Sequence, residues 1–258
     1  MDPAKWPKKF GEAPVLAELV KAGELPPVEQ RIPEEPMLVK PVHTIGKYGG
    51  TSRRGFTGPA DGENGDRIVS TDKILFWDYT GIKIRPCVAR DWRLNDDGKV
   101  CIIFLRKGMK WSDGHPFMAD DSVFWYEDVY LSKDLQLTPH PDFMVNGKPG
   151  ILRKPDEYTV VLDFPEANYL FVDMLAGSTT IGGGQATQQY LSRTMGAYMP
   201  AHYLKQFHPK YVAKEEFEKK VKAAASIQNR FLMVAHPHWE GLFPLRTVRR
   251  EAAFGWPA

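Results

Sequence analysis

The amino-acid sequence predicts a mixed α/β fold, and three stretches of the chain carry this prediction. A run of turn-forming residues at 95–98 precedes the apolar stretch 100–105, which is typical of a β-hairpin and its return strand. Acidic residues at 120 and 121 favour a helix over residues 122–130, because negative charge suits the positive end of a helix. Residues 158–164 alternate between apolar and more polar side chains, which indicates a strand with one wetter face.

Finer expectations follow for these elements. The stretch 100–105 is apolar without a break, so we expect a strand that is buried on both faces. We expect Asp120 or Asp121 to be the N-cap of the helix that follows. The inner face of that helix would be formed by four apolar side chains, those of Phe117, Val123, Phe124 and Val129.

The flanking segments predict shorter elements. The first 47 residues cannot form a long helix, because prolines interrupt them at positions 26, 27, 33, 36 and 41. One short amphipathic helix is expected over residues 13–22, with Gly23 as its stop. We also expect a strand at 51–56, a loop at 58–65, and a helix end or a strand at 75–79. Further helices are expected at 168–175, 200–205 and 212–225.

Composition excludes several classes of protein. The 258 residues suffice for one large or two small domains. Lys and Arg number 34 against 32 Asp and Glu, and so small an excess gives no general case for binding nucleic acid or an anionic membrane. No apolar run approaches the ~20 residues that span a bilayer, so no transmembrane helix is predicted. The first seven residues lack the apolar core and cleavage site of a secretory signal peptide.

The sequence offers no convincing site for catalysis, a metal or a cofactor. G-x-S-x-G and H-E-x-x-H are absent, and the glycines at 182–184 lack the Lys and Ser or Thr of a phosphate-binding loop, which favours a flexible linker. His115 beside Asp113, or His236 with His238, could be imagined as acid–base or metal sites, but no second ligand cluster stands at a zinc-like spacing. We therefore expect a protein that is not an enzyme and holds no cofactor.

The two cysteines, Cys87 and Cys101, are far too few for a disulfide scaffold. A single bridge between them remains possible, and two free, buried thiols are the favoured interpretation.

One motif resembles a known family. Residues 105–124, LRKGMKWSDGHPFMADDSVF, resemble the pattern LR-x-G-x-x-[FW]-x-DG-x-P-[FL]-x-A-x-D-V-x-F of the family 5 extracytoplasmic solute-binding proteins, with Ser122 where the family usually has Val. Further segments resemble the family in the expected order, at residues 49–51, 86–92, 95–99, 156–160 and 199–204. The resemblance covers about residues 37–212.

Independently of the resemblance, Asp113-Gly114 predicts a tight turn, and Pro116 fixes the entry to a helix capped by Asp120. The motif is therefore expected to be a folding element and not a catalytic one.

The resemblance implies a periplasmic-binding-protein type II architecture that is incomplete. A Pro-rich leader would occupy residues 1–45, part of domain I residues 46–70 and 180–226, an inserted domain II residues 71–179, and an atypical basic tail residues 227–258. Family members are much longer and carry an export signal, which suggests a truncated or frame-shifted product.

The resemblance also implies a function. The chain would be the substrate-binding component of an ABC importer, working outside the cytoplasm with the importer's permease subunits. A peptide is the first expectation for its ligand, and an oligosaccharide is plausible given the tryptophans. The candidate ligand-binding residues are Arg53, Phe56, Thr57 and Gly58, from the stretch that follows the opening strand, and Trp77, one of the tryptophans that could line a ligand cleft. For these, the alternatives are a solvated surface arginine and a tryptophan packed in the core. A remnant without transport, serving as an interaction module, is the alternative for the whole chain.

Overall fold

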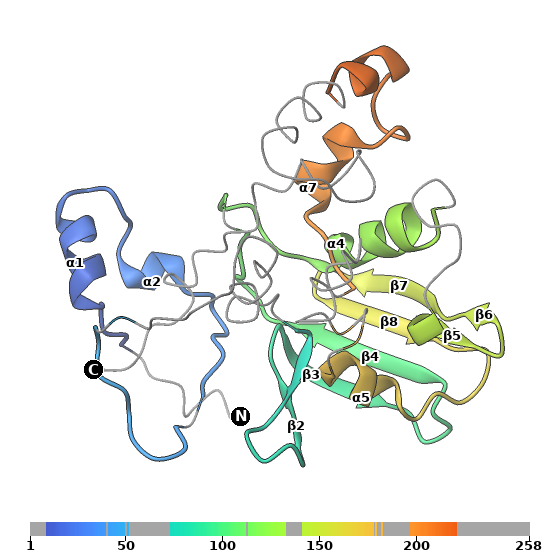
Figure 1. The fold of residues 1–258 in the computed structure, drawn as a ribbon, viewed down its shortest axis with the longest axis horizontal. Coiled ribbons are helices and arrows are strands. Elements are labelled where there is room, and N and C mark those ends of the chain that lie inside the picture. The colour runs from blue at the N-terminus through green and yellow to red at the C-terminus, as the bar shows by residue number, and fades with distance from the viewer. Residues whose placement is uncertain are drawn as a thin grey trace, which may run out of the picture.

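The computed structural model describes residues 9–39, 41–49, 51, 73–111, 113–132, 141–177, 179, 182 and 197–220. Its centre is a four-stranded antiparallel sheet with the strand order β3-β4-β8-β7 (Figure 1). The strands are β3 (Ala89–Leu94), β4 (Val100–Leu105), β7 (Ile151–Asp156) and β8 (Thr159–Asp163).

The predicted hairpin is confirmed, because β3 and β4 pair directly across the turn. The Asn95 side-chain oxygen accepts hydrogen bonds from the backbone N–H groups of Lys99 at 2.9 Å and Val100 at 2.8 Å. Gly98 has a φ of +69°, a left-handed conformation that glycine adopts without steric cost.

The remaining elements are short helices, helical turns and two small hairpins. The helices are α1 (Pro14–Lys21), α2 (Val28–Arg31), α4 (Ala119–Phe124), α5 (Phe171–Ala176) and α7 (Ala201–Leu204), with a π-helical turn at Trp125–Tyr130 and 3₁₀ turns at Pro141–Phe143 and Lys205–Phe207. Two small hairpins are formed by β1 (Leu75–Trp77) with β2 (Ile84–Pro86), and by β5 (Met144–Val145) with β6 (Lys148–Pro149). Residues 214–220 are helical.

These elements agree with most of the sequence expectations. Helices occur at α1, α5, α7 and 214–220, as predicted, and the ambiguous stretch 75–79 contains a strand. The expected strand at 51–56, the loop at 58–65 and the tail at 227–258 lie outside the described residues, except for residue 51. The predicted domain boundaries remain a prediction.

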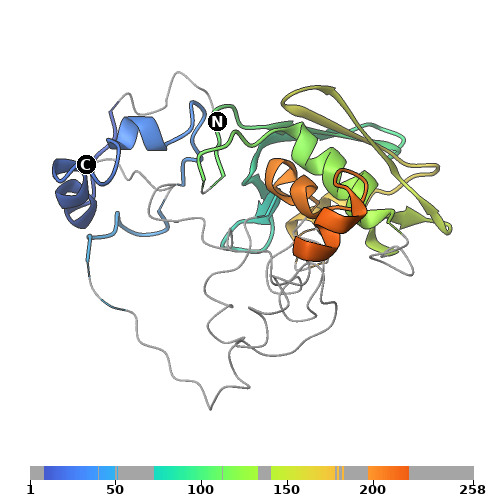
Figure 2. The ribbon, with the colours of Figure 1, turned by 90° about the horizontal axis from the view of Figure 1, so that it is seen from above.

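The core lies between one face of the sheet and the helices α4, α5 and α7, which share one side of it (Figure 2). Its centre is aromatic: Trp125, Tyr130, Phe143 and Phe171 are at most 1% exposed. The predicted inner face of the helix is confirmed for three of its four residues, since Phe124 and Val129 are buried and Val123 packs against the core. Phe117 is buried as well but precedes α4, which begins at Ala119.

The expectation that β4 is buried on both faces is wrong. Cys101, Ile103 and Leu105 are buried, whereas the side chains between them are half-buried. The reason is that side chains alternate along a strand and, among the described elements, the helices cover only one face of the sheet. On the other face Phe104 lies beneath the guanidinium groups of Arg90 and Arg93, at 5.7 Å and 5.6 Å from its ring centre.

Residues 33–36, here called the N-terminal strap, are bound to the end of the sheet by a buried arginine. Arg106 donates from Nε to the Cys87 carbonyl at 2.8 Å, and from Nη1 to the carbonyls of Glu35 and Pro36 at 3.3 Å and 3.2 Å. The Glu35 N–H donates to the Lys107 carbonyl at 3.4 Å, which continues the contact. Part of the Pro-rich leader is therefore packed against the sheet.

Substitution of Gly108 by alanine tests whether the N-terminal strap packs closely against this position. Its φ is +77°, and a Cβ built there would lie 2.7 Å from the Glu34 backbone nitrogen. Gly147 is the matched control, because its φ is +72° and a Cβ would meet nothing within 4 Å. We expect both Gly→Ala variants to lose the ~1–2 kcal/mol that a left-handed residue costs, and Gly108→Ala to lose about 1–3 kcal/mol more through overpacking. Urea denaturation measures both, and equal losses would show that the strap does not pack closely on Gly108.

Candidate functional site

The family-like motif folds into a tight turn that leads into α4. Backbone hydrogen bonds run from the Gly114 N–H to the Trp111 carbonyl at 2.9 Å and from the Trp111 N–H to the His115 carbonyl at 2.8 Å. Gly114 has a φ of +89°, which explains the need for glycine in this turn. The Asp113 carboxylate accepts the His115 backbone N–H at 3.0 Å and so holds the turn closed.

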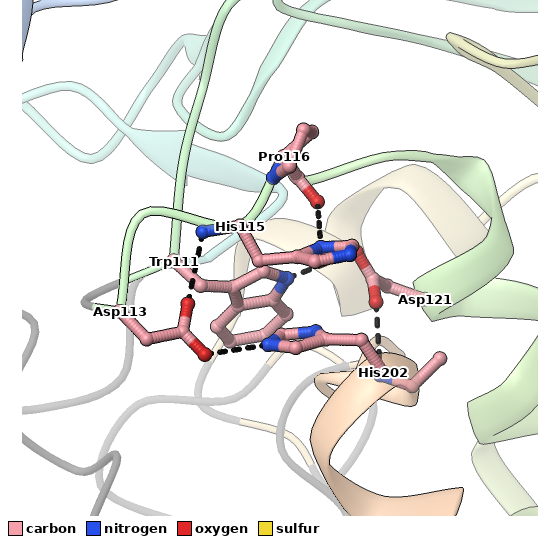
Figure 3. A network of polar contacts seen from close by, with 7 residues as sticks. Trp111, Asp113, His115, Pro116, Asp121 and His202 are labelled. Carbon is pink, nitrogen blue, oxygen red and sulfur yellow. Dashed lines mark hydrogen bonds and ion pairs between the residues drawn. The ribbon is translucent and has the colours of Figure 1, made fainter.

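The buried carboxylate of Asp121 joins three segments of the chain (Figure 3). Its Oδ2 accepts hydrogen bonds from Trp111 Nε1 and from the Met118 N–H, both at 3.0 Å. Its Oδ1 accepts the Ala201 N–H, also at 3.0 Å. The turn, the beginning of α4 and the beginning of α7 therefore meet at one side chain, which we call the Asp121 joint.

The N-cap of α4 differs from the expectation. The N-cap residue is Met118, and Asp121 binds the free Met118 N–H from the third position of the helix. Asp120 points elsewhere and forms an ion pair with Lys154 at 2.5 Å. Asp121 is the buried acid, and its carboxylate also contacts Trp111 and Ala201.

Two histidines lie beside this joint. His202 Nε2 is 2.6 Å from Asp113 Oδ2, and the His202 ring stacks on the His115 ring with centroids 3.8 Å apart and planes 2° from parallel (Figure 3). His115 Nδ1 is 3.0 Å from the Pro116 carbonyl, which can only accept, so this nitrogen carries the hydrogen. The pair thus fastens the turn to α7.

The two carboxylates respond oppositely to their surroundings. Burial raises the pKa of Asp121, although the hydrogen bonds from Met118, Ala201 and Trp111 partly oppose this effect. Partial burial also acts to raise the pKa of Asp113, but the hydrogen bonds from His202 and the His115 backbone outweigh it and lower that pKa.

The polar contacts of this site hold three segments of the chain together. The pair of His115 and Asp113 imagined from the sequence differs in the structure, where the Asp113 carboxylate accepts the His115 backbone N–H and contacts the ring of His202 instead. In the part of the chain that the structure describes, no group of three His, Cys, Asp or Glu side chains could hold a metal ion. His236 and His238 lie outside the described residues.

Of the predicted ligand-binding residues, only Trp77 is described. It lies in β1, partly buried and packed against the core, which fits the core-packing alternative. Arg53, Phe56, Thr57 and Gly58 lie outside the described residues. The core cavity beneath the sheet has about 10 Å³ of space, enough for one water molecule at most, and its apolar lining includes Phe171 and Leu105.

The sequence did not predict the partnership of His202 with Asp113. Both residues belong to segments that resemble the family, but they stand 89 positions apart, and a local pattern does not report such a contact. The only available signal was that two separate motifs occur in one chain.

The remaining sequence expectations concern thiols and membranes. Cys87 and Cys101 form no disulfide with each other, as favoured, but only Cys101 is buried, whereas Cys87 is half-buried. Burial raises the pKa of Cys101 to about 12. Among the described residues, no helix has the length and apolar character needed to cross a membrane.

The contact between Asp113 and His202 predicts a dependence of stability on pH. Because the pKa of Asp113 is lowered from its ordinary value of 3.8, the contribution is full above that value and is lost as the pH falls through the folded-state pKa. We expect Asp113→Asn to lose about 1 kcal/mol or less at pH 5, since the pair is partly exposed, and the gap from wild type to narrow at pH 3.

Urea denaturation at pH 7, 5 and 3 measures this dependence. Asp96→Asn is the control, because Asp96 is an exposed residue of the β3–β4 turn, and its substitution should change stability little at each pH. A difference between Asp113→Asn and wild type that stays constant down to pH 3 would contradict the prediction.

Comparisons with known proteins agree with the motif. The family model described as "Bacterial extracellular solute-binding proteins, family 5 Middle" matches residues 83–228. The periplasmic alpha-galactoside-binding protein of Rhizobium meliloti (strain 1021) is 31% identical over 219 residues, which are 76% of this chain and 29% of that protein. This chain is therefore similar to a stretch of a much longer protein.

Two solved structures extend the likeness to the fold. A structure of an oligopeptide-binding protein OppA has a TM-score of 0.70 and 36% identity, covering 93% of this chain and 33% of the other. The periplasmic binding protein MelB of Agrobacterium fabrum C58, in complex with stachyose, has a TM-score of 0.59 and 25% identity, covering 84% and 34%. The chain spans about a third of the length of these relatives, and its mixed α/β architecture matches this part of the periplasmic-binding-protein fold. It belongs to family 5 of the bacterial extracellular solute-binding proteins.

Proposed function

We propose that the chain acts in the substrate-binding component of an ABC importer, which captures a solute outside the cytoplasm and passes it to the permease subunits. The observation that carries this proposal is the family match over residues 83–228, because that range includes the turn, the Asp121 joint and α7. The chain spans about a third of the length of its relatives, so capture by the whole receptor is part of the proposal.

The geometry supports binding without chemistry. The Asp121 carboxylate is occupied by three N–H donors, and Asp113 is occupied by His202 and the His115 backbone. General acid–base catalysis needs a group that can reach a substrate proton, and these carboxylates face other parts of the chain. The relatives are likewise named as binding proteins.

The proposed ligand is a peptide, with an oligosaccharide as the second candidate. The likeness to the oligopeptide-binding protein at 36% identity supports a peptide. The likeness to the alpha-galactoside-binding protein and to the stachyose complex supports an oligosaccharide. Arg53 is the proposed partner of a peptide carboxylate. Trp77 is partly buried against the core, so only the exposed part of its ring would be available to stack on a sugar.

A remnant that binds no solute is the alternative, and ligand binding discriminates between the two. A ligand at 100 times its dissociation constant should stabilise the folded chain by about 2.7 kcal/mol. A remnant would show no such shift with any ligand.

We expect the 258-residue chain by itself to bind weakly, because the relatives' remaining length has no counterpart in these residues. The experiment is thermal denaturation and calorimetry with di-, tri- and oligopeptides and with stachyose, each at up to millimolar concentration. The expected result is stabilisation by one of the two classes at millimolar ligand, with no sub-micromolar affinity.

Two variants test whether Arg53 is responsible for the stabilisation by peptides. Arg53→Ala should reduce stabilisation by peptides several-fold, whereas Arg85→Ala, at an exposed position in β2, should leave it unchanged. No stabilisation by any ligand would favour the remnant, and a sub-micromolar dissociation constant would contradict the expectation of weak binding.

A further inference from the structure

Residues 197–211, here called the clamp, contain α7 and the 3₁₀ turn Lys205–Phe207 and lie across the α4 side of the sheet (Figure 2). The clamp is packed into the core at its first half: Met199 is 1% exposed and Leu204 is fully buried. Tyr198 adds ring contacts to Trp111 and Phe117, at 6.1 Å and 5.1 Å between centroids.

The first anchor of the clamp is the Asp121 joint. The Met199 N–H donates to the Asp121 backbone carbonyl at 3.1 Å, and the Ala201 N–H donates to the Asp121 carboxylate at 3.0 Å. His202 Nε2 adds the 2.6 Å contact with Asp113 Oδ2. Both the main chain and the side chain of one helical residue therefore hold the beginning of α7.

The second anchor is a different buried acid. Asp128, in the π-helical turn, is 4% exposed, and its carboxylate accepts hydrogen bonds from Lys210 Nζ at 2.7 Å and the Tyr211 hydroxyl at 2.6 Å. Its backbone carbonyl lies 3.1 Å from His208 Nε2. His208 Nδ1 accepts the Lys210 N–H, so Nε2 carries the hydrogen and donates to Asp128. The hydrogen bond to Asp128 raises the pKa of Lys210.

We propose that the clamp and the four-stranded sheet form one cooperative unit, so that residues 197–211 move with the sheet in any rearrangement of the protein. The two anchors stand on one continuous helical segment and hold the two ends of the clamp. Rotation of the clamp about one anchor would break the hydrogen bonds of the other anchor. A buried carboxylate would then lose its donors, which is unfavourable in free energy.

This inference changes the domain assignment proposed from the sequence. There, residues 180–226 belonged to the first domain and residues 71–179 to the inserted one. The anchors place 197–211 with the inserted domain instead. In a receptor that closes two lobes around a solute, the clamp would move with the lobe that contains the sheet. This last consequence rests on the proposed function, whereas the cooperative unit itself does not.

Native-state hydrogen exchange of the full 258-residue chain, without ligand, tests the proposal. The Met199 and Ala201 amides report on the clamp, and the Leu105 and Phe164 amides, which donate to backbone carbonyls at 2.7 Å and 2.8 Å, report on the sheet. We expect all four to exchange through openings of the same free energy and the same denaturant dependence. Clamp amides that open at a lower free energy than the sheet amides would overturn the proposal, whatever the outcome of ligand binding.

A matched pair of variants provides a second measurement. Asp121→Asn removes the charged acceptor, and we expect exchange at clamp and sheet amides to accelerate by the same factor, about tenfold or more. Asp120→Asn changes the neighbouring acid, whose side chain is 44% exposed, and should accelerate exchange by less than about threefold. Faster exchange in the clamp alone would contradict a single unit, and if Asp121→Asn does not fold, Asp128→Asn gives the same comparison from the other anchor.

Discussion

The buried carboxylate of Asp121 is the interaction on which the arrangement of this structure depends. Burying a charged group is unfavourable unless hydrogen bonds replace its lost water, and here three N–H donors do so. These donors come from a tryptophan side chain, a helix start and a segment 80 residues further along the chain. Because each donor would also be costly to leave unpaired, the carboxylate specifies how the three segments must meet.

The joint requires the sheet beneath it. The buried face of β4 packs its apolar side chains beneath α4 and α5, and this layer fixes the helix that carries both Asp121 and Asp128. At the end of the same strand, Arg106 uses its guanidinium to bind three carbonyl groups, including two of the N-terminal strap. One strand and one helix thus organise segments from both sides of the sequence, with buried charged groups setting where each segment attaches.

The sequence was sufficient to predict features that depend on neighbouring residues. The β3–β4 turn, α1 and α5 follow from turn residues, prolines and apolar periodicity, all of which act locally. Each of Asp121, Asp113 and Arg106 also has a partner 70 to 89 positions away, and these distant contacts could not be predicted in this way. The expectation that β4 is buried on both faces was wrong for a related reason. An unbroken apolar run does not reveal which faces of a sheet are covered by other elements. The predicted ligand residues other than Trp77 lie outside the described part of the chain.

The nature of the joint also bears on what the family motif signifies. The Asp121 carboxylate accepts hydrogen bonds from three segments of this chain, so this part of the motif specifies how those segments are assembled. The family match spans both the turn and α7, which are in direct contact here. Proteins named for an alpha-galactoside and for oligopeptides both resemble most of this chain. A framework whose polar groups bond to one another is compatible with either ligand. Specificity can then be set by other side chains, which the framework holds in position but which do not contribute to its packing.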